Sequence, residues 1–295
     1  MLSGHKSILL NKKKLYPYLF LAPSLIGVTI FSFLPLLDVV RHSFTDAMGN
    51  AWTGFNNYRI VWTNQAFLMA LNNTVKFLGV SIPILLLLSL GTALAINHLK
   101  GSQRVFRTTL LFPLAIPVAC STLFFKLFFH ELGWLNQMLP DFYADKDWLK
   151  GGSAFFIIVF CYVWKNIGYD MILWSAGLKG IDISLYEAAR VDGAGRIESF
   201  RYITMPLLKP VTCTIIILSV LNGFKIFREA YLLAGDYPDK SIYMLQHLFT
   251  NWFVALDIQK MSAGAVSIGG GVVAMVLLLQ MGANRRGRNG KMEKN

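Results

Sequence analysis

Six long apolar segments dominate the pattern of hydrophobic and polar positions along the chain. A bilayer core about 30 Å thick takes about 20 helical residues at a rise of about 1.5 Å per residue. The six segments reach this length over residues 15–37, 74–96, 108–129, 154–178, 207–233 and 263–283. The first is too long for a signal-peptide core and no clear cleavage site follows it, so it is interpreted as an uncleaved helix. The pattern predicts an all-α membrane protein, a polytopic bundle of six transmembrane helices within residues 15–283.

Composition agrees with this fold class and excludes two others. Hydrophobic residues make up 55% of the 295 residues and charged residues only 15%, whereas about a quarter of a soluble domain is charged. The formal net charge is +12, but the 28 Lys and Arg are spread thinly along the chain. Nucleic-acid binding needs a dense basic surface. Composition therefore argues against a soluble domain and against a nucleic-acid partner.

The positive charges instead carry an orientation signal. The segments between the predicted spans alternate between two sides, and the side that holds both chain ends has 17 Lys and Arg, counting Lys209 at the start of the fifth span, against six on the other. Positively charged loops stay on the cytoplasmic side of a membrane. We therefore predict that both termini are cytoplasmic, with basic tails at residues 1–14 and 284–295.

No catalytic, metal or cofactor motif is visible in the sequence. A phosphate-binding G-x-x-x-x-G-K-[ST] loop, a G-x-S-x-G elbow and an H-E-x-x-H pair are all missing from it. The three cysteines, Cys120, Cys161 and Cys213, fall inside predicted spans, and the histidines are scattered. We expect no catalytic residue, no metal site and no cofactor in this chain.

The segment between the fourth and fifth spans, residues 180–206, has the most specific pattern. Ser184 and Glu187 stand three apart, as in a capping box that starts a helix. Gly193 and Gly195 then supply a stop and a turn, a second short helix is predicted over residues 196–203, and Pro206 suits the first turn of the fifth span. Two short helices on the cytoplasmic face form either a docking element for a partner or an interfacial helix on lipid. Spacing alone leaves both open.

The same loop resembles the EAA signature of ABC importer permeases, E-A-A-x3-G-x9-I-x-L-P. Met205 stands where the signature has Leu, a swap between apolar side chains of similar volume. The matching residues are Glu187, Ala188, Ala189, Gly193, Ile203 and Pro206. Other segments, from LFLAPSLIG near the amino end to FKIFREAYLL in the fifth span, are similar to the carbohydrate-uptake branch of these permeases, the maltose and glycerol-phosphate type.

This resemblance implies a type I ABC importer permease of a bacterial cytoplasmic membrane that translocates a carbohydrate by alternating access. Its implied partners are a second permease subunit, two ATPase subunits that hold ATP and Mg, an extracytoplasmic solute-binding protein and membrane lipid. The loop would be the site of ATPase coupling. The residues implied in coupling are Glu187, Ala188, Ala189, Asp192, Gly193, Ile203 and Pro206. Glu187 would face basic or polar groups of the ATPase, and the two alanines would permit close approach.

Ionisable residues inside the spans mark a candidate substrate path, because they are costly to place in a bilayer. Asn222, Lys225, Arg228 and Glu229 form one stripe of the fifth helix. The stripe could offer donors and acceptors to sugar hydroxyls. Alternatively, Lys225 and Arg228 snorkel to lipid headgroups or pair with Glu229. Lys165 and Asp170 in the fourth span are five positions apart and therefore do not pair on one face. Either could also serve the path, although ordinary inter-helix bonding is favoured for both.

The alternative from another class is a secondary transporter or channel driven by an ion gradient. Such a protein is expected to show repeated halves and buried acidic sites. No convincing internal repeat is present, and only Asp170 and Glu229 are acidic within the predicted spans. A membrane enzyme would need a catalytic set that the sequence lacks. The sequence therefore favours a transport subunit that is not an enzyme.

Overall fold

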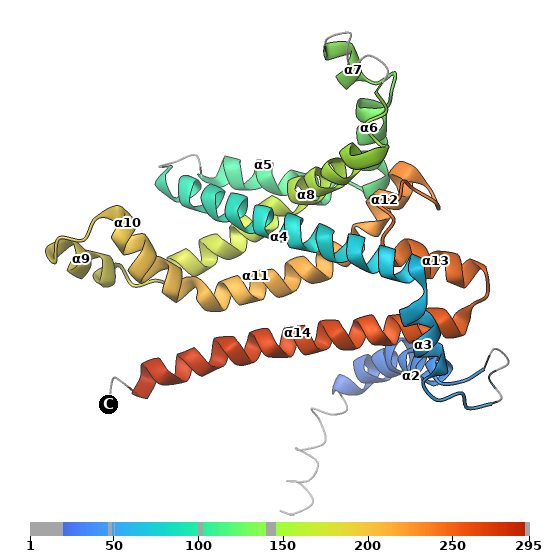
Figure 1. Ribbon diagram of the computed structural model, residues 1–295. Helices are drawn as coiled ribbons and strands as arrows, with labels where there is room; N and C mark the ends of the chain where they lie inside the picture. The colour runs from blue at the N-terminus through green and yellow to red at the C-terminus, as the bar shows by residue number, and fades with distance from the viewer. Residues whose placement is uncertain (1–19, 47–48, 50, 100–102, 140–145, 293–295) are drawn as a thin grey trace, which may run out of the picture. The chain divides into compact units, whose positions relative to one another are not determined.

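The computed structural model describes residues 20–292 except 47–48, 50, 100–102 and 140–145. The described part is almost wholly helical, and its one extended pairing is an isolated antiparallel bridge between Thr45 and Trp52 (Figure 1). Five helices there are long and apolar enough to cross a membrane, and a bent pair makes up to six. This number fits the predicted spans. The chain divides into two compact units, residues 1–63 with 252–270, and residues 64–251 with 271–295.

The first unit begins with a helix over Phe20–Ser43. This helix includes the π-helical turn η1 (Thr29–Phe33) and then α2 (Leu34–Ser43), whose first turn contains Pro35. A widened turn is a common way to accommodate a proline that lacks an N–H. The helix α3 (Asn56–Thr63) follows, and the Asn57 side chain donates to the carbonyls of Ser43 at 3.1 Å and Thr45 at 2.8 Å. The last helix, α14 (Ile258–Met292), starts in this unit.

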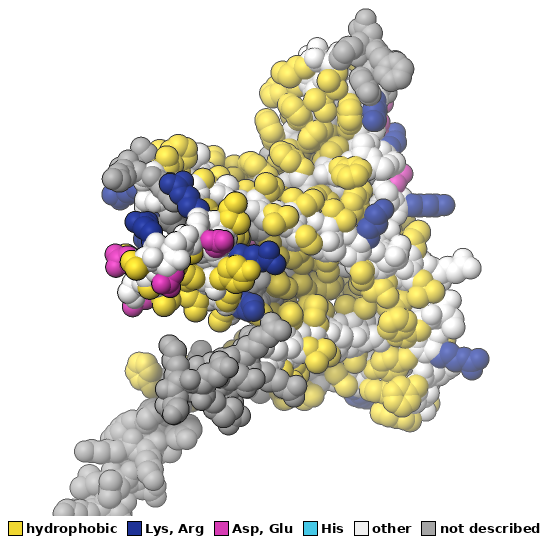
Figure 2. All heavy atoms as spheres, turned by 60° about the vertical axis from the view of Figure 1, so that its left-hand side comes forward, with side chains coloured by type: hydrophobic (Ala, Val, Ile, Leu, Met, Phe, Trp, Pro, Cys, Tyr) yellow, Lys and Arg dark blue, Asp and Glu magenta, His cyan; other side chains and the backbone are white. Residues whose placement is uncertain are grey.

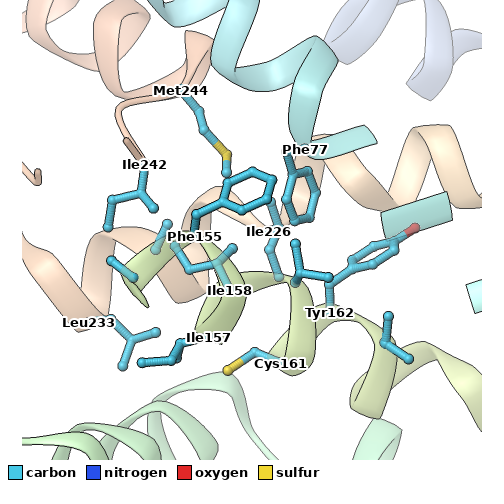
Figure 3. Packing of buried hydrophobic residues seen from close by; sticks show 14 of the residues in the cluster. Phe77, Phe155, Ile157, Ile158, Cys161, Tyr162, Ile226, Leu233, Ile242 and Met244 are labelled. Carbon is cyan, nitrogen blue, oxygen red and sulfur yellow. The ribbon is translucent and has the colours of Figure 1, made fainter. Parts of the chain in front are cut away.

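The second unit is built around three long helices, α4 (Gln65–His98), α8 (Gly151–Lys179) and α11 (Met205–Lys225). One buried cluster lies on α8 and its neighbours and includes Phe77, Phe155, Tyr162, Ile226 and Met244 (Figure 3). A second cluster joins the other ends of the long helices. It includes Leu90, Met171, Trp174, Leu208 and Ile215. Apolar residues of the predicted spans therefore also form the packed interior of this unit.

The predicted third span is broken, so the prediction of one straight helix over residues 108–129 is wrong. α5 (Gln103–Ala115) and α6 (Val118–Phe129) meet at a bend of 90°. Pro117 stands at the break with ψ 137°, and a residue that precedes a proline, here Ile116, is disfavoured in the α conformation. Hydrophobicity alone cannot report this break, because the apolar run continues through it.

The fifth span also differs from the prediction. The second short helix expected over residues 196–203 is not a separate element, because α10 (Arg196–Ser199), the π-helical turn η3 (Phe200–Thr204) and α11 follow one another without interruption. The widened turn directly precedes Pro206, which again lacks an N–H. At the other end, a single turn residue, Ile226, separates α11 from α12 (Phe227–Ala234).

The remaining described helices lie in the connections. α7 (Trp134–Met138) follows α6, α9 (Ile183–Val191) follows α8, and α13 (Leu245–Val254) precedes α14. α4 starts well before the predicted apolar run because the Asn64 side chain caps it by accepting from the Phe67 N–H at 3.0 Å. Polar caps fix the ends of helices, whereas the apolar pattern marks only their middles.

Candidate functional site

The loop of residues 180–206 forms a short, firmly capped helix, α9. Its N-cap is Asp182, whose carboxylate accepts from the Ser184 N–H at 3.0 Å. This hydrogen bond lowers the pKa of the Asp182 carboxyl. The predicted capping box, in which Ser184 caps the helix together with Glu187, is therefore wrong. The helix begins earlier, at Ile183, because the Asp182 carboxylate accepts from the Ser184 N–H, which would otherwise lack a partner at the start of the helix.

The carboxyl end of α9 depends on Gly193. The Ala194 N–H donates to the Ala189 carbonyl at 2.8 Å, and the Gly193 N–H donates to the Arg190 carbonyl at 3.1 Å. These two bonds form a Schellman motif, which needs a left-handed residue after the helix. Gly193 has φ +84°, a conformation that costs residues with a Cβ about 1–2 kcal/mol. Gly193 therefore sets the direction in which the chain leaves α9.

The outer surface of α9 and α10 mixes charged and apolar side chains. Glu187 and Asp192 are exposed, and Val191 is 88% exposed. Within the part of the chain that the structure describes, Glu187 makes no ion pair and no hydrogen bond through its side chain. Figure 2 shows acidic and basic side chains gathered around this loop, whereas hydrophobic side chains cover much of the neighbouring helices. The loop thus presents free charge and apolar surface together.

The inner side of the loop is attached to the second unit. The Tyr186 hydroxyl hydrogen-bonds to the Thr204 hydroxyl at 2.8 Å. Tyr186, Phe200 and Ile203 pack against the second buried cluster. Ile203 therefore anchors the loop to the core, whereas Pro206 is exposed at the start of α11. The residues assigned to coupling therefore form three groups: a mostly exposed set on α9 and the turn that ends it, the anchoring Ile203 on η3, and the exposed Pro206 on α11.

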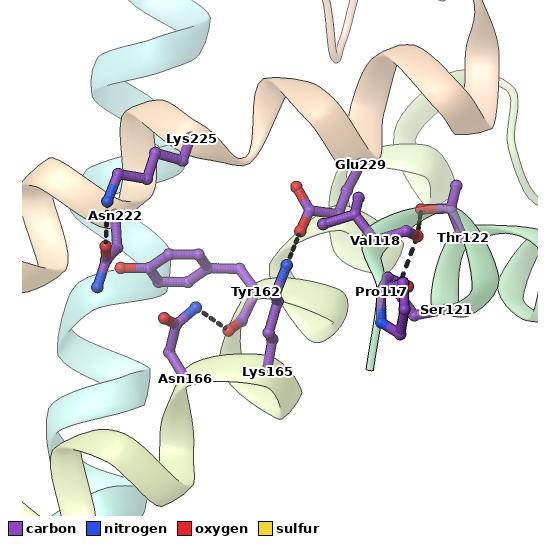
Figure 4. Close-up of polar contacts among 10 residues, drawn as sticks. All are labelled: Pro117, Val118, Ser121, Thr122, Tyr162, Lys165, Asn166, Asn222, Lys225 and Glu229. Atoms are coloured by element: carbon purple, nitrogen blue, oxygen red, sulfur yellow. Dashed lines mark hydrogen bonds and ion pairs between the residues drawn. The ribbon is translucent and has the colours of Figure 1, made fainter. Parts of the chain in front are cut away.

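At the far end of α11, a cavity of about 400 Å³ opens between α8, α11 and α12, beside the break between α5 and α6. Four of the five residues predicted to lie along a substrate path line it: Asn222, Lys225, Arg228 and Glu229. From α8 the cavity also has Lys165, which the sequence left open between a substrate path and an inter-helix contact. The structure adds three α8 residues that sequence reasoning did not place there: Tyr162, Asn166 and Tyr169. Figure 4 shows part of this arrangement. The cavity has the volume of a typical small-molecule site.

Glu229 pairs across two helices rather than within its own stripe. Its carboxylate lies 2.5 Å from Lys165 Nζ, and the exposed fractions of the two side chains are 9% and 19% (Figure 4). Lys225 donates instead to the Asn222 side-chain oxygen at 3.2 Å. The Lys165–Glu229 contact joins residues 64 positions apart in the chain, so no spacing rule within one helix could predict it.

Asp170 lies outside the cavity lining and is only 1% exposed. It accepts from the Ser219 hydroxyl at 3.1 Å, and the Tyr162 hydroxyl donates to the Ser219 carbonyl at 2.6 Å. These bonds join α8 to α11. Asp170 thus makes the inter-helix hydrogen bond that the sequence favoured for it, and it contributes no surface to the cavity.

Comparison with known proteins identifies the class. The profile of the family described as "Binding-protein-dependent transport system inner membrane component" matches residues 77–284. The chain belongs to this family. It is a multi-pass membrane permease subunit of an ABC importer, and it is not an enzyme. The comparisons give no support to the alternative of a secondary transporter or channel.

Relatives and solved structures agree with this class. The sulfoquinovosyl glycerol transport system permease protein SmoG of Agrobacterium fabrum is 33% identical, over 86% of this chain and 85% of that protein. The trehalose/maltose transport system permease protein MalF of Thermococcus litoralis is 32% identical, over 80% of this chain and 82% of that protein. A chain of a bacterial ABC transporter involved in the import of the acidic polysaccharide alginate has the same fold, with TM-score 0.78, 21% identity and coverage of 95% of this chain and 99% of that one.

Proposed function

We propose that this chain forms one half of the translocation pathway for a carbohydrate that an extracytoplasmic binding protein delivers. A second permease subunit forms the other half. Two separate ATPase subunits, which hold the ATP and Mg, dock on the loop of residues 180–206, so that this loop and both chain termini are cytoplasmic. The observation that carries the proposal is the uninterrupted helical connection from the exposed loop to the polar cavity.

The connection is suited to transmit a displacement. α10, η3 and α11 follow one another from Arg196 to Lys225, a length of about 45 Å at about 1.5 Å per residue. α9 is fixed to this rod by the Tyr186–Thr204 hydrogen bond and by the packing of Ile203. A movement imposed on α9 by an ATPase therefore reaches Asn222 and Lys225 at the cavity. Such a movement shifts the population between inward-facing and outward-facing states.

The exposed set on α9 supplies the contact with the ATPase. Glu187 has a free carboxylate for basic or polar groups of the partner, and the exposed Asp192 at the end of α9 adds a second negative charge. The small side chains of Ala188 and Ala189 let a partner surface approach the helix backbone. Pro206 is exposed where the loop joins α11. Ile203 acts from the inside, as the anchor that makes the loop move together with α11.

The cavity supports a carbohydrate as the substrate class. Sugar hydroxyls need both donors and acceptors in a confined space. The lining offers the Asn222 amide, the Asn166 carbonyl oxygen and the Tyr169 hydroxyl beside the charged groups. The ring of Tyr169, which is partly exposed, adds aromatic surface. The relatives are named for sulfoquinovosyl glycerol and for trehalose and maltose, which are carbohydrates or their derivatives.

A matched pair of glycine variants tests the coupling. Gly193→Ala forces a Cβ into a left-handed conformation (φ +84°), although no neighbouring atom lies within 4 Å. Gly195→Ala places a Cβ at φ −73° with ordinary contact to Glu198. The strain in Gly193→Ala amounts to about 1–2 kcal/mol and tilts the exit from α9. In proteoliposomes that hold the whole importer, we expect Gly193→Ala to lower sugar uptake per ATP hydrolysed, and Gly195→Ala to behave as the wild type.

Two further variants make the test specific. Gly193→Asn should recover part of the uptake, because asparagine tolerates the left-handed conformation better than alanine does. Glu187→Lys breaks no hydrogen bond or ion pair within the described residues, and we expect less ATPase to co-purify with this variant. Membrane levels of each permease serve as the control for insertion. If Gly193→Ala and Glu187→Lys both support wild-type uptake and co-purification, the loop is not the coupling site.

A further inference from the structure

We propose that the carbohydrate which passes through this cavity is anionic, bearing a carboxylate, phosphate or sulfonate, and that Lys225 and Arg228 bind its charged group. This inference rests on the proposed function, which by itself requires only a carbohydrate of any charge. It concerns the cavity at the end of α11 and adds a chemical class of substrate to it.

The lining of the cavity carries a net positive charge. Three cationic side chains, Lys165, Lys225 and Arg228, line the cavity, against a single anionic side chain, Glu229. Lys165 and Glu229 lie 2.5 Å apart and are both largely buried, so each compensates the other. The lining is left with two uncompensated positive charges.

Lys225 and Arg228 both keep hydrogen-bond donors that no anionic group of the described residues occupies. Lys225 Nζ has one hydrogen bond, to the neutral side chain of Asn222 at 3.2 Å. Arg228 has no ion pair and no hydrogen bond through its side chain in the described ranges of the chain. They stand three positions apart, at the end of α11 and the start of α12, on either side of Ile226. Two neighbouring cations with free donors form a site for an anionic group, and the planar fork of arginine suits its paired oxygens.

The surroundings of the two cations also suit an anionic sugar. Val118, the first residue of α6, also lines the cavity, so the positive end of that helix dipole borders the same space. Polar neutral groups, among them Tyr169 and Asn166, remain to bind sugar hydroxyls. Lys225 and Arg228 are both exposed, and a neutral sugar could offer them only the oxygen dipoles of its hydroxyls. An anionic sugar supplies the missing charge, and its attraction to the cations is stronger in a cavity than in bulk water.

The alternative source of negative charge is a lipid headgroup, to which lysine and arginine side chains near a helix end can extend. Both side chains line a concave space that they share with the Lys165–Glu229 pair and two tyrosines, whereas headgroups lie at the membrane surface. The geometry therefore favours a substrate anion, and the experiment separates the two sources.

The first arm of the experiment uses matched substrate pairs. A strain that lacks this chain is compared with its parent for uptake of carbohydrates that differ only in an anionic group: trigalacturonate and galactotriose, glucose 1-phosphate and glucose, glycerol 3-phosphate and glycerol, and 6-sulfonated and unmodified glucose glycosides. We expect every lost uptake to be of an anionic member. Loss of a neutral member overturns the inference and leaves the proposed function standing. If uptake of no carbohydrate is lost, the proposed function fails together with the inference.

The second arm tests the two residues on the substrate found in the first. In proteoliposomes with the complete importer, Lys225→Gln and Arg228→Gln should each raise the apparent KM at least about tenfold, as expected for loss of a charge-assisted hydrogen bond. Arg228→Lys keeps the charge but loses the fork, and it should give an intermediate value. Lys150→Gln removes an exposed lysine that does not line the cavity and should leave KM within about twofold.

Co-purification of the ATPase subunits and of the second permease subunit reports whether each variant still assembles, independently of substrate charge. If Lys225→Gln and Arg228→Gln assemble and leave KM at the wild-type value, the two cations face lipid headgroups and the inference is overturned. If Arg228→Gln alone fails to assemble, Arg228→Lys and Lys225→Gln decide, because a wild-type KM in both contradicts a role in anion binding.

Discussion

The Lys165–Glu229 ion pair gives the sharpest test of the packing around the cavity. Glu229→Gln leaves the Lys165 ammonium without a carboxylate at a position where the lysine side chain is only 19% exposed. Removing one partner of a buried pair destabilises a protein by about 3–5 kcal/mol, because the remaining charge is uncompensated. Lys165 borders a cavity that water can enter, so we expect the lower end, about 3 kcal/mol. Such a loss lowers the unfolding temperature by roughly 6–12 °C.

A double-mutant cycle isolates this effect. Glu229→Gln, Lys165→Met and the double variant are purified with the partner subunits, and thermal unfolding is measured in lipid nanodiscs at a fixed protein concentration. The two single variants should each be much less stable than the wild type. The double variant, which buries no unpaired charge, should recover most of the loss, as replacement of a buried pair by apolar groups often costs little.

The coupling free energy of the cycle shows whether Lys165 and Glu229 pair. Residues in direct contact show coupling of about 0.5–3 kcal/mol, whereas independent sites add within about 0.3–0.5 kcal/mol. Additive losses from Glu229→Gln and Lys165→Met would show that the two side chains do not pair. The charge accounting of the cavity would then be wrong as well, because Lys165 and Glu229 could not be treated as mutually neutral.

Two further predictions concern packing and pH. Gly168→Ala would place a Cβ 2.0 Å from the Leu110 carbonyl oxygen, so it should separate α8 from α5 and lower the unfolding temperature, whereas Gly91→Ala, which meets no atom within 4 Å, should not. Burial lowers the pKa of His247 to about 4, against an unfolded value of about 6.5. Between these values the unfolded chain binds the additional proton, so stability should fall as the pH falls from 7 to 4.5. His247→Asn keeps an acceptor for the Met244 N–H, and its stability should lack this decline. Thermal unfolding of both proteins across that pH range is the measurement. An equal decline in the variant would show that protonation of His247 is not its cause.

The sequence predicted the number of spans because spans depend on length and hydrophobicity, which a linear pattern records. It also predicted the turn at Gly193, because only a residue without a Cβ suits φ +84° at low cost. The break at Pro117 was missed, since its effect on Ile116 is local and leaves the apolar run intact. The choice of Asp182 over Ser184 as the cap of α9 was missed because both side chains are good caps and their spacing cannot rank them.

The residues that line the cavity were only partly predictable from the sequence. The stripe of Asn222, Lys225, Arg228 and Glu229 was visible as a helical spacing, and these four residues do line one cavity. The partner of Glu229 was not visible, because Lys165 lies on another helix. Periodicity reports which residues share a face of one helix, and it says nothing about which residue of a second helix meets that face. The net charge of the cavity can therefore be derived only from the three-dimensional structure, which shows which polar residues pair with one another.

The most direct test of the account is ATP-dependent uptake in proteoliposomes. This chain, its second permease subunit, the ATPases and the binding protein are reconstituted together, and uptake of the carbohydrate found with the deletion strain is measured with and without ATP inside the vesicles. The account predicts uptake only in the complete assembly with ATP, and none when the ATPases are left out. Uptake by vesicles that contain this chain alone, driven by an ion gradient, would contradict it.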